Sequence, residues 1–436
     1  MGALCIWMNG ELVGTWSVGR TGNHRLEYAP AWRQSARSRP LSLSLPFTAD
    51  NRIEGDAVRN YFDNLLPDSD LIRQRIRSRF RIKGSDGFAL LQAIGRDCVG
   101  AVQLLPQGVP PDGYRQLQYE PLTPERIEKH LAALGASAGE LEQEDEDNFR
   151  LSIAGAQEKT ALLKVDNRWC SPLGATPTTH ILKPPIGVTQ GRNLDMRLSV
   201  ENEWLCSQIL RASGLPTAQC EIEDFGARRV LVVTRFDRSV HPDGWIIRLP
   251  QEDLCQAKGV SSEQKYEQNG GPGMDECLKV LQGSEASQED GRNFLCAQLM
   301  FWLLAAIDGH AKNFSLFVLA GGRYRLTPLY DVLSAWPLIG NGAHALPYKK
   351  TKMAMAVRGK TAHYKLAEIH RRHWQALAER SGVKDAWQAM LDMTQRLDGV
   401  LTEVEGRLPA DFPKVLAQSV FAGVRMHLEH FNKVAV

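Results

Sequence analysis

The residues most suited to chemistry lie in the segment Asp308-Gly309-His310-Ala311-Lys312-Asn313, where a carboxylate precedes a side-chain amide by five positions. In protein kinases a carboxylate accepts the proton of the acceptor hydroxyl, and an asparagine five residues later holds Mg²⁺. A second metal-binding carboxylate is expected downstream on a short β segment, and Asp331 ends the run Thr327-Pro328-Leu329-Tyr330-Asp331. The spacing therefore predicts Asp308 as the catalytic base and Asn313 and Asp331 as metal ligands in phosphoryl transfer.

The same residues also have structural interpretations. Asp308 follows an apolar helix predicted over 289–307 and could cap it, although a carboxylate is poorly placed at the negative end of a helix dipole. Asn313 and Asp331 could instead form turns through their own side chains. His310 is interpreted as a structural hydrogen-bonding group, because no other histidine is spaced to complete a zinc site.

A kinase also needs a lysine on a strand that contacts the nucleotide phosphates, oriented by an acid on a nearby helix. Lys183 ends a strand predicted over 179–183, and Glu203 lies in a helix predicted over 199–212. We predict that Lys183 contacts phosphate and that Glu203 orients it. The alternative is a lysine on the surface at a strand end and a solvated glutamate.

The candidate phosphate-covering loop is the segment 152–160, which joins two strand-like runs and contains a single glycine, Gly155. It matches neither G-x-x-x-x-G-K-[ST] nor G-x-G-x-x-G. Ala154 and Ala156 are small enough to let backbone N–H groups approach phosphate oxygens. On composition alone, however, the segment is only a loop.

The 436 residues are enough for two large lobes or about three domain-sized units. Hydrophobic residues at 43% and charged residues at 23% are typical of globular proteins. The formal charge of +2 creates no field that forces nucleic-acid or membrane binding, so any contact with DNA must come from a local patch. The 8 cysteines never form a C-x-x-C pair and are interpreted as reduced thiols.

Targeting signals are not apparent. The first residues lack the basic region and cleavage site of a secretory signal, and Ile6 stands where N-myristoylation needs Ser or Thr. The longest apolar run, 294–307, is too short for a bilayer, which takes about 20 residues. The sequence predicts a cytoplasmic protein without a membrane association.

The pattern of residues changes along the chain. Asn9-Gly10 predicts a β hairpin, the alternating run 41–45 predicts a strand, and 56–81 predicts a basic helix that faces solvent, a partner or phosphate groups. Thr123-Pro124-Glu125 predicts the start of a helix that runs to about Leu134. Further strands are predicted over 160–165, 229–234, 314–318 and 324–326, and further helices near 364–381, 384–407 and 411–431.

These elements predict an α+β fold with two lobes. We expect a β-rich N-terminal subdomain with helices over 1–134, an acidic linker over 135–148, the nucleotide-binding part over 149–250 and a helical catalytic lobe over 251–436.

Taken in order, the motifs resemble those of the HipA family, the serine/threonine kinase toxins of bacterial toxin–antitoxin modules. The likeness covers nearly the whole chain and rests on the segments NLLPD (64–68), SIAGAQEKT (152–160), THILKPP (179–185), RFDR (235–238), LPQED (249–253), DGHAKN (308–313) and LTPLYD (326–331). The resemblance implies a two-lobed protein-kinase-like fold with an added N-terminal β-rich subdomain, and ATP with Mg²⁺ as cofactors.

The resemblance also assigns roles to individual residues. Ser152 matches the family's autophosphorylation site, whose modification expels the phosphate loop and inactivates the enzyme. The strand that leads through Thr234 to Phe236 resembles the hinge that holds adenine. The implied ATP contacts are Ala154, Gly155, Ala156, Gln157, Lys159, Lys183, Thr234, Phe236, His310 and Lys312.

Members of this family phosphorylate glutamyl-tRNA synthetase and so cause growth arrest and persistence. Their antitoxin HipB, a small helix-turn-helix dimer, binds the kinase and operator DNA, and the complex represses its own operon. Arg371 and Arg372 are candidate contacts to DNA phosphates in such a complex, or else part of a solvated helix face. Two alternatives remain open: a non-catalytic kinase-fold co-repressor that binds antitoxin and DNA, and a small-molecule kinase.

Overall fold

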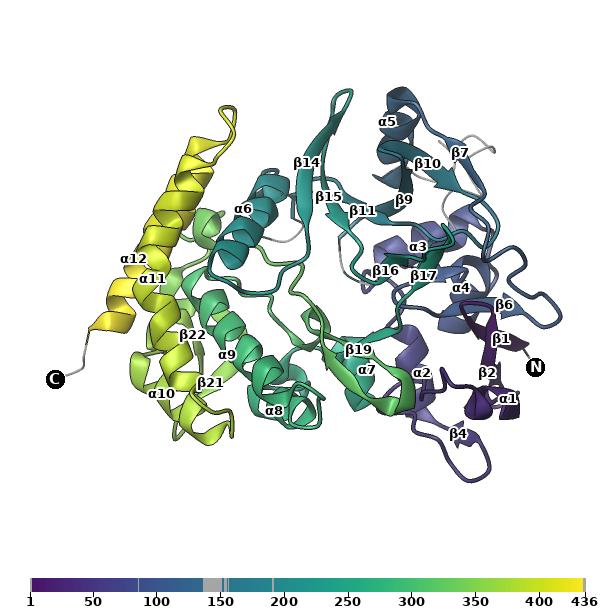
Figure 1. Ribbon diagram of the computed structural model, residues 1–436. Coiled ribbons are helices and arrows are strands. Elements are labelled where there is room, and N and C mark those ends of the chain that lie inside the picture. Colours follow the sequence, from purple (N-terminus) through teal and green to yellow (C-terminus); the bar gives the residue numbers. More distant parts are fainter. Residues whose placement is uncertain are drawn as a thin grey trace. The chain divides into compact units, whose positions relative to one another are not determined.

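The structure, a computed structural model, describes residues 2–84, 86–135, 151–152, 155, 157–189 and 192–433 (Figure 1). The chain forms two compact units. The first consists of Met1–Pro184, Glu223–Glu263 and Ser315–Tyr324, and the second of Pro185–Ile222, Gln264–Phe314 and Arg325–Val436. The acidic linker predicted over 135–148 lies, apart from Gly135, outside the described residues. The domain boundaries predicted from the sequence remain predictions.

The first unit contains most of the strands. Its helices are α1 (Pro30–Gln34), α2 (Asp56–Asp63), α3 (Asp70–Arg79), α4 (Gly87–Ile94), α5 (Pro124–Ala132) and α7 (Leu254–Lys258). Its strands are β1 (Gly2–Met8), β2 (Glu11–Val18), β3 (His24–Tyr28), β4 (Arg52–Glu54), β5 (Asp97–Cys98), β6 (Gln103–Pro106), β7 (Tyr119–Pro121), β8 (Leu151–Ser152), β9 (Thr160–Val165), β10 (Arg168–Pro172), β11 (His180–Lys183), β15 (Arg228–Thr234), β16 (Arg238–Val240), β17 (Ile246–Arg248), β18 (Gln251–Asp253) and β19 (Ser315–Val318). Along β14 (Cys220–Phe225) and β20 (Tyr324–Leu326) the chain passes from one unit to the other.

The N-terminal sheet has the strand order β4-β3-β2-β1-β6. The predicted hairpin is confirmed: β1 and β2 are antiparallel, and Asn9 and Gly10 between them have φ of 48° and 82°, as a type I′ turn requires. A core of buried apolar side chains lies between this sheet and α2 and α4, with Trp16 stacked on Phe62 at 3.9 Å between ring centroids.

One prediction in this region is wrong, and another is confirmed with an interruption. The run 41–45 is not a strand but a turn with one isolated bridge, Ser42 to Leu45. Its backbone groups bond to a side chain instead, since Leu41 N–H donates to the Tyr28 hydroxyl, which donates to Leu45 O at 2.6 Å. The helical pattern predicted over 56–81 is confirmed as two helices, α2 and α3. Pro67, which has no N–H to donate, lies between them, and the Ser69 side chain caps α3 by accepting from Ile72 N–H.

The second sheet of this unit has the order β14-β15-β11-β9-β10-β7, and it contains the strands predicted over 160–165, 179–183 and 229–234. Helix α5 packs on it through Ile127 and Leu131. Thr123 caps α5 as expected, because its side chain accepts from Arg126 N–H. The helix ends at Ala132, and a single 3₁₀ turn, Ala133–Gly135, follows it.

The second unit is mainly helical. Its helices are α6 (Ser199–Ala212), α8 (Met274–Leu281), α9 (Ser287–Leu303), α10 (Arg371–Arg380), α11 (Ala386–Gly406) and α12 (Lys414–Asn432), and its strands are β12 (Gly187–Val188), β13 (Asp195–Met196), β21 (Lys352–Arg358) and β22 (Ala362–Lys365). Helix α9 is buried along most of its length, and its Trp302 stacks on His427 of α12 at 4.2 Å between centroids. The helix predicted over 199–212 is confirmed at both ends.

Within the part of the chain that the structure describes, no helix combines the length and the apolar character needed to cross a membrane. All eight cysteines are free, and seven of them are buried, which agrees with the interpretation as reduced thiols.

Candidate active site

Asp308 lies in a turn beyond helix α9. The helix ends at Leu303, short of the predicted Ile307, because Ala305 adopts φ of 48°, and the chain reverses with Ala306 N–H bonded to Phe301 O at 2.7 Å. Asp308 is therefore not at the helix terminus, so the interpretation of this residue as a helix cap is wrong. Its carboxylate is well placed for chemistry, since 63% of the side chain is exposed.

The Asn313 side chain bonds to both of the segments that carry the candidate acids, Asp308 and Asp331. Its side-chain Nδ2 donates to the backbone oxygens of Asp308, at 3.1 Å, and of Asp331, at 3.5 Å. The amide nitrogen is thus bonded to the protein backbone. The amide oxygen, which is the atom that can bind a metal ion, is the other terminal atom of the side chain. Asp331 itself has φ of 62°, a strained conformation for a non-glycine residue and one that is concentrated at active sites.

Asn313 and Asp331 have the chemistry of a magnesium site. Mg²⁺ takes oxygen ligands and is commonly bound by one or two protein carboxylates together with phosphate oxygens. Among the described residues, no group of three or more His, Cys, Asp or Glu could hold a metal ion. In chemistry, an asparagine and a carboxylate fit a Mg²⁺ ion that is also bound by nucleotide phosphates.

Two further side chains, those of His310 and Tyr266, lie close to the Asp308 carboxylate, and Lys312 follows in the same segment. His310 is buried, and its Nε2 lies 3.9 Å from Asp308 Oδ1. Lys312 is also buried, and its backbone oxygen accepts from the Tyr330 hydroxyl at 2.9 Å. The sequence interpretation missed Tyr266, whose hydroxyl donates to Asp308 Oδ1. No motif spacing could have found it, because it lies 42 residues before Asp308 in the chain.

In the first unit, the candidate phosphate loop has a backbone that only glycine suits. Gly155 has φ of 116°, and a Cβ built there would lie 2.4 Å from Lys159 Nζ. Gln157 Nε2 donates to Pro184 O at 2.8 Å, which links the loop to the segment that follows Lys183. The predicted contacts Ala154 and Ala156 lie outside the described residues.

The N-terminal subdomain holds this loop. Asp68 N–H donates to Gly155 O at 2.9 Å, and Arg75 of α3 forms an ion pair with Glu158. Burial raises the pKa of Glu158 despite the nearby Arg75. Strand β8 pairs in parallel with β5 and sets the backbone of Ser152 beside Cys98. At least one basic residue of helix α3, Arg75, therefore forms a contact within the protein.

The other predicted nucleotide residues lie on the second sheet of the first unit or after it. Lys183 is buried at the end of β11, and β11 pairs with β15, where Thr234 is the last residue. Phe236 packs edge-on against Phe317, with 5.8 Å between ring centroids. Glu203 is buried in α6 of the second unit. The pairing of Lys183 with Glu203 remains a prediction.

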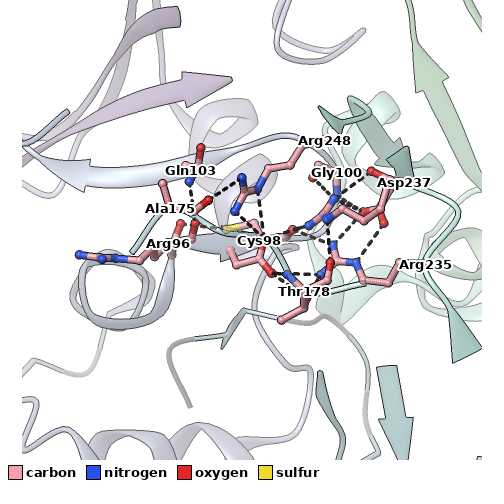
Figure 2. A network of polar contacts seen from close by, with 12 residues as sticks. Arg96, Cys98, Gly100, Gln103, Ala175, Thr178, Arg235, Asp237 and Arg248 are labelled. Carbon is pink, nitrogen blue, oxygen red and sulfur yellow. Dashed lines mark hydrogen bonds and ion pairs between the residues drawn. The ribbon is translucent and has the colours of Figure 1, made fainter. Parts of the chain in front are cut away.

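Directly after β15, a buried ionic network joins this sheet to the N-terminal subdomain (Figure 2). Its acids are Asp97 of β5 and Asp237, and its bases are Arg235, Arg238 and Arg248. Burial opposes the ionisation of Asp97, but the attraction of the three arginines outweighs it and holds the pKa of Asp97 well below its usual range. The RFDR motif thus supplies structural charges next to the strand that ends at Thr234.

The two candidate DNA contacts differ in environment. Arg371 lies over the ring of Trp387, with its guanidinium carbon 5.2 Å from the centroid, and also over Phe431. Arg372 is exposed, and its Nε lies 3.3 Å from His373 Nε2. Arg372 is thus the more accessible of the two, whereas Arg371 also serves helix packing.

The fold and this cluster define a class of protein. A mixed α+β fold, with an antiparallel sheet in one unit and, in the other, an Asn313 side chain that bonds the backbones of both Asp308 and Asp331, fits the class of kinases.

Comparison with known proteins agrees with that class. Residues 151–404 match the HipA-like C-terminal domain, and residues 4–105 match the HipA N-terminal domain. The provisionally named kinase Y4mE of Sinorhizobium fredii is 34% identical over 386 residues, which are 87% of this chain and 86% of that protein. The serine/threonine-protein kinase toxin HipA of Shewanella oneidensis is 30% identical over 337 residues, 74% of this chain and 73% of the relative.

A solved structure shows the same fold. The complex of HipA, HipB and operator DNA from Shewanella oneidensis MR-1 contains a chain that superposes with a TM-score of 0.79 at 22% identity, over 99% of this chain and 100% of that one. From the sequence matches, the chain belongs to the HipA family of serine/threonine kinase toxins, and it is an ATP-dependent kinase.

Proposed function

We propose that this protein transfers the γ-phosphate of ATP to a hydroxyl of a translation enzyme, with glutamyl-tRNA synthetase as the specific substrate, and thereby causes growth arrest and persistence. The observation that carries the proposal is the arrangement of Asp308, Asn313 and Asp331, in which one amide links the backbones of both acids. A scaffold without catalysis has no use for such a set. The choice of substrate is supported by the resemblance to the HipA family.

In the proposed reaction, the oxygen of the acceptor hydroxyl forms a bond to the γ-phosphorus, the bond from that phosphorus to the ADP oxygen breaks, and the proton of the hydroxyl passes to Asp308. Asn313 and Asp331 would hold Mg²⁺. When bound, Mg²⁺ neutralises charge on the phosphate oxygens. Lys183 contacts the phosphates, and the strand that ends at Thr234 receives the adenine. His310, whose Nε2 is 3.9 Å from Asp308 Oδ1, and Lys312, buried in the same segment, are proposed to support the same site.

The proposed partners are a HipB-like helix-turn-helix antitoxin dimer and, through it, operator DNA. The support is the fold shared with the HipA chain of the HipA–HipB–operator complex. Arg372, exposed at the first turn of α10, is the candidate contact to DNA phosphates, with Arg371 beside it.

We further propose that Ser152 is autophosphorylated and that this switches the enzyme off. The support is the position of Ser152 directly before the Gly155 loop, which contacts Asp68 and Arg75 in the described conformation. A phosphoserine adds roughly −1.5 to −2 charges at neutral pH, which oppose the binding of ATP phosphates in the same loop.

The test of catalysis uses Asp308→Asn and Asp331→Asn. Each variant should lose more than about 10²-fold in phosphate transfer from ATP, the scale of a lost proton acceptor or metal ligand, and should keep the melting temperature of the wild type. Asp243→Asn is the matched control, because that side chain is 79% exposed. Mass spectrometry of a cell lysate incubated with the protein, ATP and Mg²⁺ identifies the substrate. Normal transfer by a folded Asp308→Asn variant contradicts the proposal.

A further inference from the structure

Tyr266 is held against the catalytic turn by a firmly anchored segment. It precedes the 3₁₀ turn Glu267–Asn269, and its backbone oxygen accepts from Asn269 N–H at 2.9 Å and from Gly271 N–H at 3.0 Å. Gly271 lies so close to the chain that a Cβ there would be 1.9 Å from Gln264 O. The backbone on both sides of the tyrosine is therefore fixed.

The next residue, Glu267, links this segment to strand β21 through a hydrogen bond and an ion pair. The Glu267 side chain is only 7% exposed, and its Oε2 accepts from Ala356 N–H at 2.6 Å. Its Oε1 forms an ion pair with Arg358. Since a buried carboxylate with both oxygens engaged has little freedom, the backbone next to Tyr266 is held in place by the fold of the unit.

The Tyr266 side chain meets two residues of the proposed active site. Its ring contacts His310 edge-on, with 5.0 Å between centroids and 85° between planes. Its hydroxyl donates to Asp308 Oδ1, the oxygen that also lies 3.9 Å from His310 Nε2. Lys265 Nζ lies 5.6 Å from the centroid of the tyrosine ring. One oxygen of the Asp308 carboxylate thus accepts a hydrogen bond from a protein side chain.

This contact leaves the carboxylate accessible. With Tyr266 in place, 63% of the Asp308 side chain is still exposed. A carboxylate has two oxygens and about four sites for accepted hydrogen bonds, and one phenolic O–H occupies one of them. A donor on Oδ1 fixes the rotation of the carboxylate, and Oδ2 is then available to accept the proton of the acceptor hydroxyl. Geometry held in advance in this way lowers the barrier to the chemical step.

We infer that Tyr266 is a positioning residue for phosphoryl transfer, which orients the Asp308 carboxylate through a hydrogen bond to Oδ1. The inference rests on the proposed role of Asp308 as the base. Tyr266 touches neither nucleotide nor acceptor in this role, so its removal should slow the chemical step and leave binding unchanged.

The experiment measures incorporation of phosphate from radiolabelled ATP into the proteins of a dialysed cell lysate. The rate is followed as a function of ATP at a fixed lysate concentration, and as a function of lysate concentration at saturating ATP. For Tyr266→Phe, which keeps the ring against His310, we expect kcat to fall by about 10- to 150-fold, the scale of one hydrogen bond to a charged group, with both KM values unchanged. Tyr348→Phe is the matched control, since it removes only the hydroxyl that bonds His427 within the same unit. This variant should keep the kcat of the wild type.

The outcomes separate this inference from the proposed function. If Asp308→Asn is inactive and Tyr266→Phe has the kcat of the wild type, the positioning role is wrong and the base assignment stands. A rise in kcat/KM for Tyr266→Phe also overturns the inference, because it shows that the tyrosine blocks the acceptor. If Asp308→Asn retains full activity, the proposed function itself fails.

Discussion

The buried ionic network gives the prediction that can be worked out furthest from the structure. Asp97 is its centre: Oδ1 accepts from Arg238 at 2.9 Å and from Arg248 at 3.1 Å, while Oδ2 accepts from the Thr178 hydroxyl at 2.7 Å. We predict that Asp97→Asn strongly destabilises the first unit. In either orientation of the new amide, its NH₂ group faces donors that are fully buried.

The size of the effect follows from the charges. Two carboxylates face three guanidiniums in the network, so loss of Asp97 leaves a single carboxylate for all three. Removing one partner of a buried ion pair costs about 3–5 kcal/mol, because the remaining charge cannot regain water. For a unit of this size, about 2–4 °C of melting temperature correspond to each kcal/mol, so the midpoint should fall by about 6–20 °C.

Differential scanning calorimetry of the wild type, Asp97→Asn and the control Asp243→Asn measures this directly. The control removes the same charge from a side chain that is 79% exposed, and it should shift the midpoint by less than about 2 °C. A midpoint for Asp97→Asn within that range would refute the argument that the network stabilises the unit through compensated buried charge.

Two other predictions concern regulation and pH. Protein incubated with ATP and Mg²⁺ should carry phosphate on Ser152 and bind nucleotide more weakly than phosphatase-treated protein, because the added negative charge opposes ATP in the loop; isothermal calorimetry with equal affinities for both samples would show that the phosphate does not act there. Burial raises the pKa of Glu252 to about 8, against bonds from Ser42 and Leu43 that favour its charged form. This folded-state pKa lies above that of the unfolded chain. The contribution of protonated Glu252 to the free energy of unfolding is therefore fully present below about pH 4.5 and is lost as the pH rises through about 8. Between pH 6 and pH 9 the free energy of unfolding should fall by about 3 kcal/mol, and Glu252→Gln should abolish most of that fall in urea titrations; an equal pH dependence in the variant would contradict the role of Glu252.

Much of the fold and of the proposed site could be predicted because the determining interactions are local in sequence. Asn9-Gly10 forms its turn through its own φ angles, and Thr123 caps α5 with a residue three positions away. The spacing of Asp308 and Asn313 within one short segment predicted that the two lie together, and the amide of Asn313 does bond to the backbone of Asp308. Such features depend on the propensities and reach of neighbouring residues, which the sequence contains directly.

Other features were decided by the tertiary structure. Alternation alone predicted a strand over 41–45, but the Tyr28 hydroxyl offered the backbone a different partner. Tyr266 reaches Asp308 across 42 residues of sequence, from a segment whose next residue, Glu267, bonds to β21. The hydrogen-bond and charge partners in these cases come from distant segments, and a buried polar group takes whichever partner the fold brings to it, since leaving it without one costs more than any local preference.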